Sequence, residues 1–205
     1  MRIITRLIAG FVLSSVCLAD PASPFTTNLL SDIGNLDIKA DQWTLSKGVL
    51  SKNSPLYHGD MLLIAKKAVV TVPLWYSLGC DLVNIQKQND KLPVAGLIFG
   101  FVDERNYWSL TIDEEFSSPI LKLVHTKNGE MVTETSAPLT IKPDEKAIAL
   151  SLEVHHQIYV KVRANKSLVL THKVSGGIER GQVGLTLQSG ICNFATATIS
   201  GIAKR

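Results

Sequence analysis

Long apolar runs are scarce in this 205-residue chain, and so are cysteines, aromatic residues and an excess of charge of one sign. Only 6% of the residues are aromatic and three are cysteine, and 21 basic residues nearly balance 18 acidic ones. No basic run with interleaved aromatic residues accompanies this balance, so we expect no nucleic-acid partner. After the first twenty residues no apolar run is long enough to cross a bilayer as a helix. We therefore expect no transmembrane segment in the mature chain.

The chain begins with the three-part pattern of a secretory signal peptide. Arg2 and Arg6 precede a short apolar run, and small residues lead to an expected cleavage site at Ala19. The alternative is a lipoprotein anchored through Cys17. In both cases the pattern predicts an exported protein, periplasmic or extracellular.

This interpretation divides the chain into three parts. Residues 1–19 are the expected signal peptide, residues 20–40 an N-terminal leader, and residues 41–205 one folded domain. Removal of the signal peptide leaves 19 basic and 18 acidic residues. The sequence pI of about 8.7 therefore gives no evidence for an acidic partner.

Motifs for zinc, nucleophilic catalysis and phosphate binding are absent too. His-Glu-x-x-His, Cys-x-x-Cys, Gly-x-Ser-x-Gly and phosphate-loop spacings do not occur. The neighbours His155 and His156 would point to opposite faces of a strand and could not share a metal. We therefore expect no catalytic triad, no metal site and no cofactor. Only calcium stays open, because oxygen ligands such as Asp32, Asp81 or Asp103 need leave no motif.

About a dozen short β-rich runs fill the chain from Trp43 to Ile202, and none shows a sustained 3.6-residue apolar period. Turn signals such as Lys127-Asn-Gly129 and Ala164-Asn-Lys166 separate many of them. This pattern predicts an all-β fold, a two-sheet antiparallel β-sandwich of the jelly-roll type.

The segment Ala95–Ile112 reads as one β-hairpin with its turn at Asp103–Asn106. Apolar residues alternate on both sides of this turn, so a single register would bury all of them on one face. The expected pairs are Phe101 with Trp108, Phe99 with Leu110, and Leu97 with Ile112.

The same register places Tyr107, Ser109 and Thr111 on the opposite face, beside the small Gly100. Such a half-polar face is typical of an antiparallel sheet that is open to water or a ligand. We expect a saccharide trough there, with Tyr107 as the stacking ring, two hydroxyl partners and Arg105 leaning over from the turn. Asp81 is a possible neighbour from another strand.

Trp75 and Tyr76 stand at a strand start, where one ring should point inward and the other outward. The outward ring is a second candidate saccharide contact. Single exposed aromatic rings are also common without a ligand, so a purely structural role is the alternative.

Loss of the signal peptide would leave Cys80 and Cys192 as an even pair in an exported chain. Each shares the apolar face of its segment, so both should point inward. We expect a disulfide that joins an early strand to the last one. Two buried free thiols are the alternative.

Several short segments together resemble the strand signatures of the concanavalin A-like lectin/glucanase superfamily, especially its laminin-G-like bacterial jelly-roll domains. They are Trp43–Leu50, Ala95–Phe99 with Asp103–Trp108, Leu121–Gly129, Leu150–Val154 with Ile158–Val162, and Gly181–Leu185. One departure is Ala147 or a neighbour, where the family commonly has tryptophan. The resemblance implies two stacked antiparallel sheets, one of them concave, with glycan binding or glycan cleavage common among relatives.

Hydrolases of that superfamily often carry Glu-x-Asp-x-x-Glu on one strand, a spacing that this chain lacks. Asp81, Asp113 and Glu153 are scattered substitutes, which surface solvation explains equally well. We therefore expect a non-catalytic domain that binds a carbohydrate or another extracellular polymer. The alternatives are a glycoside hydrolase or lyase of the same fold, and a structural or protein-interaction domain. Asn165-Lys-Ser167 has the form of a glycosylation sequon but fits a hairpin turn.

Overall fold

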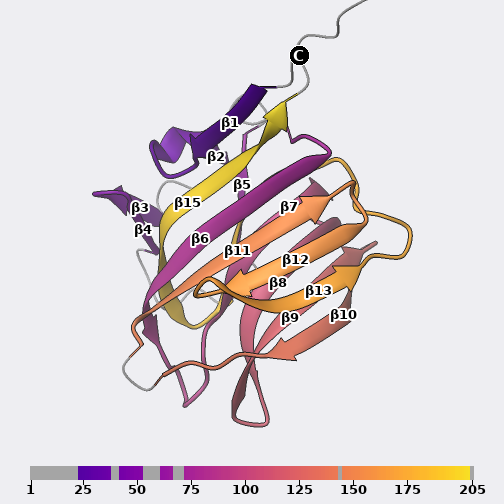
Figure 1. Cartoon of the computed structure of the whole chain (residues 1–205). Helices are drawn as coiled ribbons and strands as arrows, with labels where there is room; N and C mark the ends of the chain where they lie inside the picture. The colour runs from indigo at the N-terminus through magenta and orange to yellow at the C-terminus, as the bar shows by residue number, and fades with distance from the viewer. Residues whose placement is uncertain (1–22, 38–41, 53–60, 67–71, 143–144, 204–205) are drawn as a thin grey trace, which may run out of the picture.

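Two antiparallel β-sheets lie face to face and enclose the main hydrophobic core (Figure 1). The computed structural model describes residues 23–37, 42–52, 61–66, 72–142 and 145–203. The expected signal peptide lies outside the described residues. Within them no helix is long and apolar enough to cross a membrane.

Among the described residues, sheet A has eight strands. Its main path runs β13-β12-β11-β6-β15-β4-β3, and β1 also pairs with β15. The bounds are β1 (Ser23–Asn28), β3 (Trp43–Ser46), β4 (Val49–Lys52), β6 (Trp75–Gln86), β11 (Ala147–His155), β12 (Tyr159–Ala164), β13 (Ser167–Lys173) and β15 (Ile191–Ala203).

In the part of the chain that the structure describes, sheet B has seven strands in the order β10-β9-β8-β7-β14-β5-β2. A short 3-10 helix, η1 (Ile33–Asn35), precedes its first strand. The bounds are β2 (Leu36–Asp37), β5 (Met61–Ala65), β7 (Val94–Asp103), β8 (Asn106–Glu115), β9 (Ser118–Lys127), β10 (Glu130–Pro138) and β14 (Gln182–Ser189). The predicted all-β, two-sheet antiparallel sandwich is confirmed.

Period-two alternation produces this architecture, as β6 shows most clearly. Tyr76, Leu78 and Leu82 are buried in the core between the sheets, while Trp75 and Asp81 point to the outer face. Successive side chains of a strand point to opposite faces, so every second residue can be apolar while the others are polar.

The sandwich begins earlier in the chain than residue 41. Residues 23–37, which the sequence places in a leader, form β1, η1 and β2. Leu29 and Leu30 are buried in the core, and Asn28 Oδ1 accepts a hydrogen bond from the backbone N of Leu30 at 3.0 Å. Few residues here alternate, so the strand pattern is weak even though the leucines are core residues.

The β7–β8 hairpin has the predicted turn but a different register. Asp103 lies opposite Asn106 as expected, whereas Phe99 pairs with Trp108 and Leu97 with Leu110. A bulge at Gly100–Val102, opposite Tyr107 alone, shifts the pairing by two residues. Gly100 has φ +57°, a left-handed conformation that glycine adopts without steric cost.

The bulge also changes the side of the sheet on which Phe101 lies. Phe101 packs against Tyr107, with ring centroids 6.2 Å apart, in a small cluster outside the main core. The expected Phe101–Trp108 pair is therefore wrong. Trp108 is a core residue as predicted, stacked on His125 at 4.0 Å, and its Nε1 donates a hydrogen bond to Glu179 at 3.3 Å.

The structure contradicts the expected disulfide. Cys80 and Cys192 both point inward as predicted, but both are buried free thiols. Asn193 pairs with Val83 in the β15–β6 register, which places Cys192 about 13 Å along the strands from Cys80. A disulfide needs Cα atoms within about 7 Å. Inward orientation alone therefore does not make the two cysteines a bonded pair.

Candidate functional site

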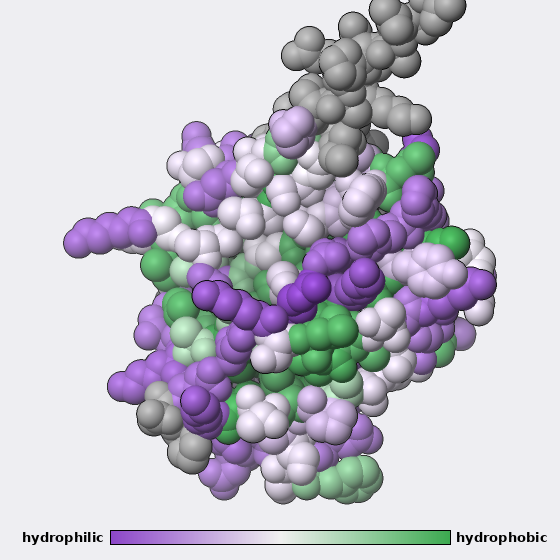
Figure 2. Space-filling model, viewed as in Figure 1, coloured by the Kyte–Doolittle hydropathy of each residue, from purple (hydrophilic) through white to green (hydrophobic). Residues whose placement is uncertain are grey.

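The outer face of sheet A carries the accessible polar groups of the candidate site. In the space-filling view this face shows a pale area over β15 and β6 and a hydrophilic band over β11 and β12 (Figure 2). Four outward residues of β6, which we name the β6 track, run along its middle: Trp75, Ser77, Gly79 and Asp81. They alternate with the buried residues of the same strand.

Neighbouring strands add small hydroxyl residues on both sides of the β6 track. Gly79 lies between Ser151 of β11 and Thr198 of β15. Ser200 of β15 lies opposite Ser77, and their hydroxyl oxygens are 2.9 Å apart. Small side chains on three adjacent strands leave room above the sheet, while their hydroxyls can both donate and accept hydrogen bonds.

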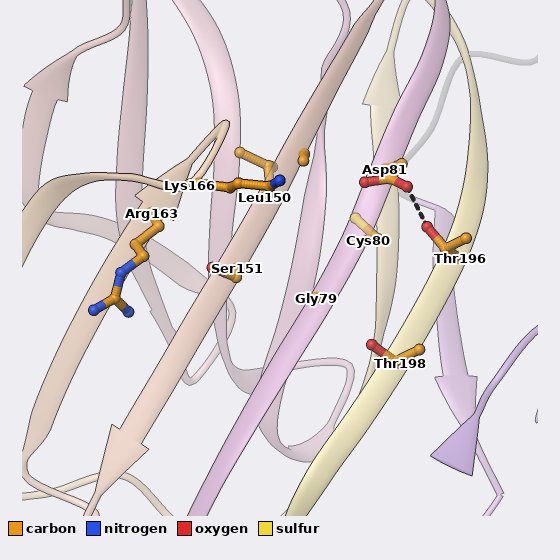
Figure 3. Close-up of a pocket in the computed structure, with 10 residues that line it drawn as sticks. Gly79, Cys80, Asp81, Leu150, Ser151, Arg163, Lys166, Thr196 and Thr198 are labelled. Atoms are coloured by element: carbon orange, nitrogen blue, oxygen red, sulfur yellow. Dashed lines mark hydrogen bonds between the residues drawn. The ribbon is translucent and has the colours of Figure 1, made fainter. Parts of the chain in front are cut away.

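A hollow of about 540 Å³ opens at the Asp81 end of the track. Gly79 forms part of its floor and contributes no side chain. Figure 3 shows residues from β6, β11, β12, the β12–β13 turn and β15 around it. The lining consists of Gly79, Cys80, Asp81, Ala149, Leu150, Ser151, Arg163, Lys166, Thr196 and Thr198.

A β-bulge in β15 brings Thr196 to Asp81. Ala195 pairs with Asp81 and Thr198 with Gly79, so β15 has one extra residue between these pairs. Thr196 has φ +49°, which is uncommon for a β-branched residue, and its hydroxyl donates a hydrogen bond to Asp81 Oδ2 (Figure 3). Bulges re-aim side chains in this way. The carboxylate is thereby held at the rim of the hollow.

Two basic residues line the opposite side of the hollow from Asp81. The Lys166 side chain extends toward the hollow, and the Arg163 guanidinium is turned away from Asp81 (Figure 3). Arg163 forms an ion pair with Glu153 instead. The hollow therefore has an anionic and a cationic rim, with hydroxyl groups between them.

Glu153 connects the hollow to the Trp75 end of the track. Burial alone would raise its pKa, but hydrogen bonds from His155 and Arg163 and their charges outweigh this effect, so the net pKa lies below its ordinary value. His155 Nε2 is 3.2 Å from Glu153 Oε2. The His155 ring also packs on Trp75, with centroids 5.0 Å apart, and Trp75 is 49% exposed.

The scattered carboxylates do not form a hydrolase pair. Asp81 lies opposite Ala149, and Glu153 is four residues farther along the same strand, about 13 Å at the rise of a β-strand. Glycosidase carboxyl groups lie about 5–10 Å apart. Asp113 is on sheet B, where it accepts a hydrogen bond from Lys122 Nζ at 2.8 Å.

Trp75 and Tyr76 divide between the two faces as predicted. Tyr76 is buried in the core, and burial raises the pKa of its hydroxyl well above the ordinary value. Of these two rings, that of Trp75 is the accessible one.

The expected trough on sheet B is closed in this structure. Tyr107, Ser109 and Thr111 face away from the main core as predicted, but they are only 3%, 1% and 3% exposed. Tyr107 packs with Ile98 in the small cluster. Within the described part of the chain, the Ser109 hydroxyl has no hydrogen-bond partner. A ligand cannot reach these groups in this conformation. Asp81, expected as their neighbour, lies on β6 of the other sheet.

Arg105 does not lean over Tyr107. Its guanidinium donates to the carbonyl oxygen of Asn128 at 2.9 Å and thus joins two neighbouring turns. The predicted Asn128-Gly129 turn forms, with φ values of +55° and +87°. Arg105 is therefore engaged in holding the hairpin ends together.

The candidate calcium ligands also have structural roles. The Asp32 side chain accepts a hydrogen bond from Gly34 N at 2.7 Å and caps η1. Asp103 binds the Asn106 side chain and the Arg105 backbone N, which lower its pKa. Among the described residues, no group of three or more His, Cys, Asp or Glu side chains could hold a metal ion.

Sequence reasoning missed Ser151, Thr198, Thr196 and Lys166 as site residues. The first two are unremarkable polar positions in alternating strands, and only the cross-strand register brings them beside Gly79. Asn165 of the sequon accepts a hydrogen bond from Ala149 N at 2.9 Å, so it braces the turn that carries Lys166.

Solved structures with the same architecture include several sugar-binding domains. The carbohydrate-binding module CBM66 from Bacillus subtilis superposes with a TM-score of 0.56 at 16% identity, over 88% of this chain and 92% of that one. The carbohydrate recognition domain of Emp47p gives 0.56 at 12% identity, over 88% of both chains. Sheep galectin-11 gives 0.51 at 11% identity, over 69% of this chain and 98% of that one.

The chain has the concanavalin A-like jelly-roll fold. Agreement over nearly the full length of three sugar-binding or galectin domains decides this point. No protein-family model and no curated protein sequence matches the chain significantly. At these identities the likeness describes the fold, so function must be argued from the site.

Proposed function

We propose that this chain is a non-catalytic carbohydrate-binding domain whose ligand lies on the outer face of sheet A. The observation that carries this proposal is the hollow on that face, where Asp81, Lys166 and small hydroxyl residues converge. Sugar hydroxyls both donate and accept hydrogen bonds. A carboxylate, an ammonium group and several hydroxyls can together accept hydrogen bonds from sugar hydroxyls and donate to them.

The fold supports the same proposal. CBM66, galectin-11 and the Emp47p domain are sugar-binding or galectin domains built on this jelly roll. The Trp75 ring adds a half-exposed aromatic surface at the end of the β6 track, and such rings stack on apolar faces while their N–H stays available for hydrogen bonding.

Export is part of the proposal, since an extracellular or periplasmic domain meets polysaccharides. It depends on the signal-peptide pattern of residues 1–19. N-terminal sequencing of the protein secreted by its native host, or by a bacterial host, should begin at Asp20. Retention of an uncleaved chain in the cytoplasm would contradict export but not sugar binding.

The binding test is a glycan-array screen of the mature domain, with and without calcium, followed by titration calorimetry on the best ligand. Asp81→Asn should weaken binding by about 1.5–3 kcal/mol, the value of a hydrogen bond to a charged group. Asp113→Asn is the matched control, because Asp113 is a carboxylate on sheet B. If no glycan binds, or if both variants bind like the wild type, the proposal is wrong.

A further inference from the structure

The two binding features proposed for sheet A, the hollow and the Trp75 ring, lie at opposite ends of the β6 track. Asp81 is at the rim of the hollow, and Trp75 is six residues earlier on the same strand. At 3.3 Å per residue, these positions are about 20 Å apart. One sugar ring is much shorter than this distance, so a single ring cannot contact both.

Mostly small side chains line the surface between them. Gly79 and Ser77 are the outward residues of β6 on the way, with Ser151 and Glu153 of β11 on one side. Thr198 and Ser200 of β15 lie on the other side. None of these side chains is long enough to block the track except that of Glu153, which is held sideways by Arg163 and His155.

Charges of both signs line the track, and Lys161 of β12 lies opposite Glu153. Glu153 is paired with Arg163, and Asp81 faces Lys166 across the hollow (Figure 3). An acidic polymer would meet a carboxylate at both places, whereas uncharged hydroxyls can bond to every rim group. The track therefore favours a neutral ligand.

We propose that the ligand is an internal stretch of an extended, uncharged polysaccharide, which lies along β6 with one ring stacked on Trp75 and another seated in the hollow. This inference depends on the proposed function and adds the ligand's length, charge and direction. Affinity should then rise with chain length until the ligand spans both ends, and level off beyond that length.

The experiment is calorimetric titration of the mature domain with neutral ladders from cellulose, xylan, mannan and amylose, from disaccharide to octasaccharide. Oligogalacturonate ladders supply the acidic counterpart. The variants are Trp75→Ala and, as matched control, Phe116→Ala, an aromatic that is 95% exposed in the β8–β9 turn of sheet B. Thermal melting checks that each variant folds.

Trp75→Ala should weaken binding of the longest bound oligomer about ten- to a hundredfold, as expected for an aromatic hot spot. The same variant should leave disaccharide binding unchanged, and Phe116→Ala should change neither. If the disaccharide binds as tightly as the octasaccharide, if the Trp75 variant behaves like the control, or if the acidic ladder binds more tightly, the inference is wrong while sugar binding stands. If no ladder binds, and the glycan-array screen finds no ligand either, the proposed function fails with it.

Discussion

Gly100 offers a direct test of the bulge that sets the β7–β8 register. Its backbone has φ +57°, and a methyl group in place of its hydrogen would lie 2.9 Å from Ile178 Cγ2 and 3.2 Å from the Glu179 carbonyl oxygen. Gly48 is a matched control, since it has φ +75° and no atom within 4 Å of the same position. Both substitutions to alanine strain the backbone, but only the methyl group of Gly100→Ala would also clash with core side chains.

The expected magnitudes differ accordingly. Gly48→Ala should lower the free energy of unfolding by about 1 kcal/mol, the lower part of the cost of a left-handed alanine. Gly100→Ala should have this cost plus about 1–3 kcal/mol for overpacking against Ile178 and Trp108. The total of about 2–4 kcal/mol is a large fraction of the stability of a small domain.

Equilibrium urea unfolding of the two variants, followed by tryptophan fluorescence, measures this difference. The slope with urea should be unchanged, so the midpoints report stability directly. If the two alanine variants are equally stable within about 0.5 kcal/mol, Gly100 is not crowded. The bulge, and with it the register that places Phe101 beside Tyr107, would then be wrong.

Two further predictions concern groups away from the bulge. Burial raises the pKa of Cys192 to about 12 and that of Cys80 well above its ordinary value. At pH 8 both thiols should therefore resist alkylation in the native protein and react fully in denaturant. A disulfide-linked peptide that contains both cysteines would contradict this prediction. In the folded state the pKa of Glu153 lies below its ordinary value of 4.5. The ionised Glu153 side chain therefore stabilises the fold fully above pH 4.5, and this stabilisation is lost as the pH falls through the folded pKa. From pH 5 to pH 3 the melting temperature of the wild type should therefore fall by more than that of Glu153→Gln. Equal falls in the two proteins would refute the role of the Arg163 ion pair.

Local patterns predicted the parts of the fold that depend on local chemistry. The turn at Asp103–Asn106 follows from the preference of Asp and Asn for tight turns, and Asp103 bonds the Asn106 amide at 2.9 Å. Period two separated Trp75 from Tyr76 and placed Trp108 in the core. Each of these features needs only neighbours in sequence.

The wrong predictions required information from distant strands. The hairpin register was wrong because Gly100 is left-handed within a bulge. The space beside it, where a side chain would meet Ile178 about 80 residues away, is not visible in the local sequence. The disulfide prediction was wrong because the local sequence shows that both cysteine side chains point inward, but it does not show the register between β6 and β15. The openness of the Tyr107 face could not be read from polarity either, since Ser109 and Thr111 are buried in spite of their hydroxyls.

The candidate site shows the same limit from the functional side. Asp81 was recognisable as an outward carboxylate, but its position at the rim of the hollow is fixed by Thr196, which reaches it through a bulge in a strand more than a hundred residues later. A β-branched residue in a left-handed conformation costs of order 1–3 kcal/mol, and such strain persists only where surrounding structure enforces it. The sandwich supplies this enforcement, because Ala195 and Thr198 on either side of the bulge are fixed by pairing with β6. The long-range topology of sheet A thus brings Thr196 to Asp81. The sequence of each strand taken alone therefore predicts the outward carboxylate but not the hollow beside it.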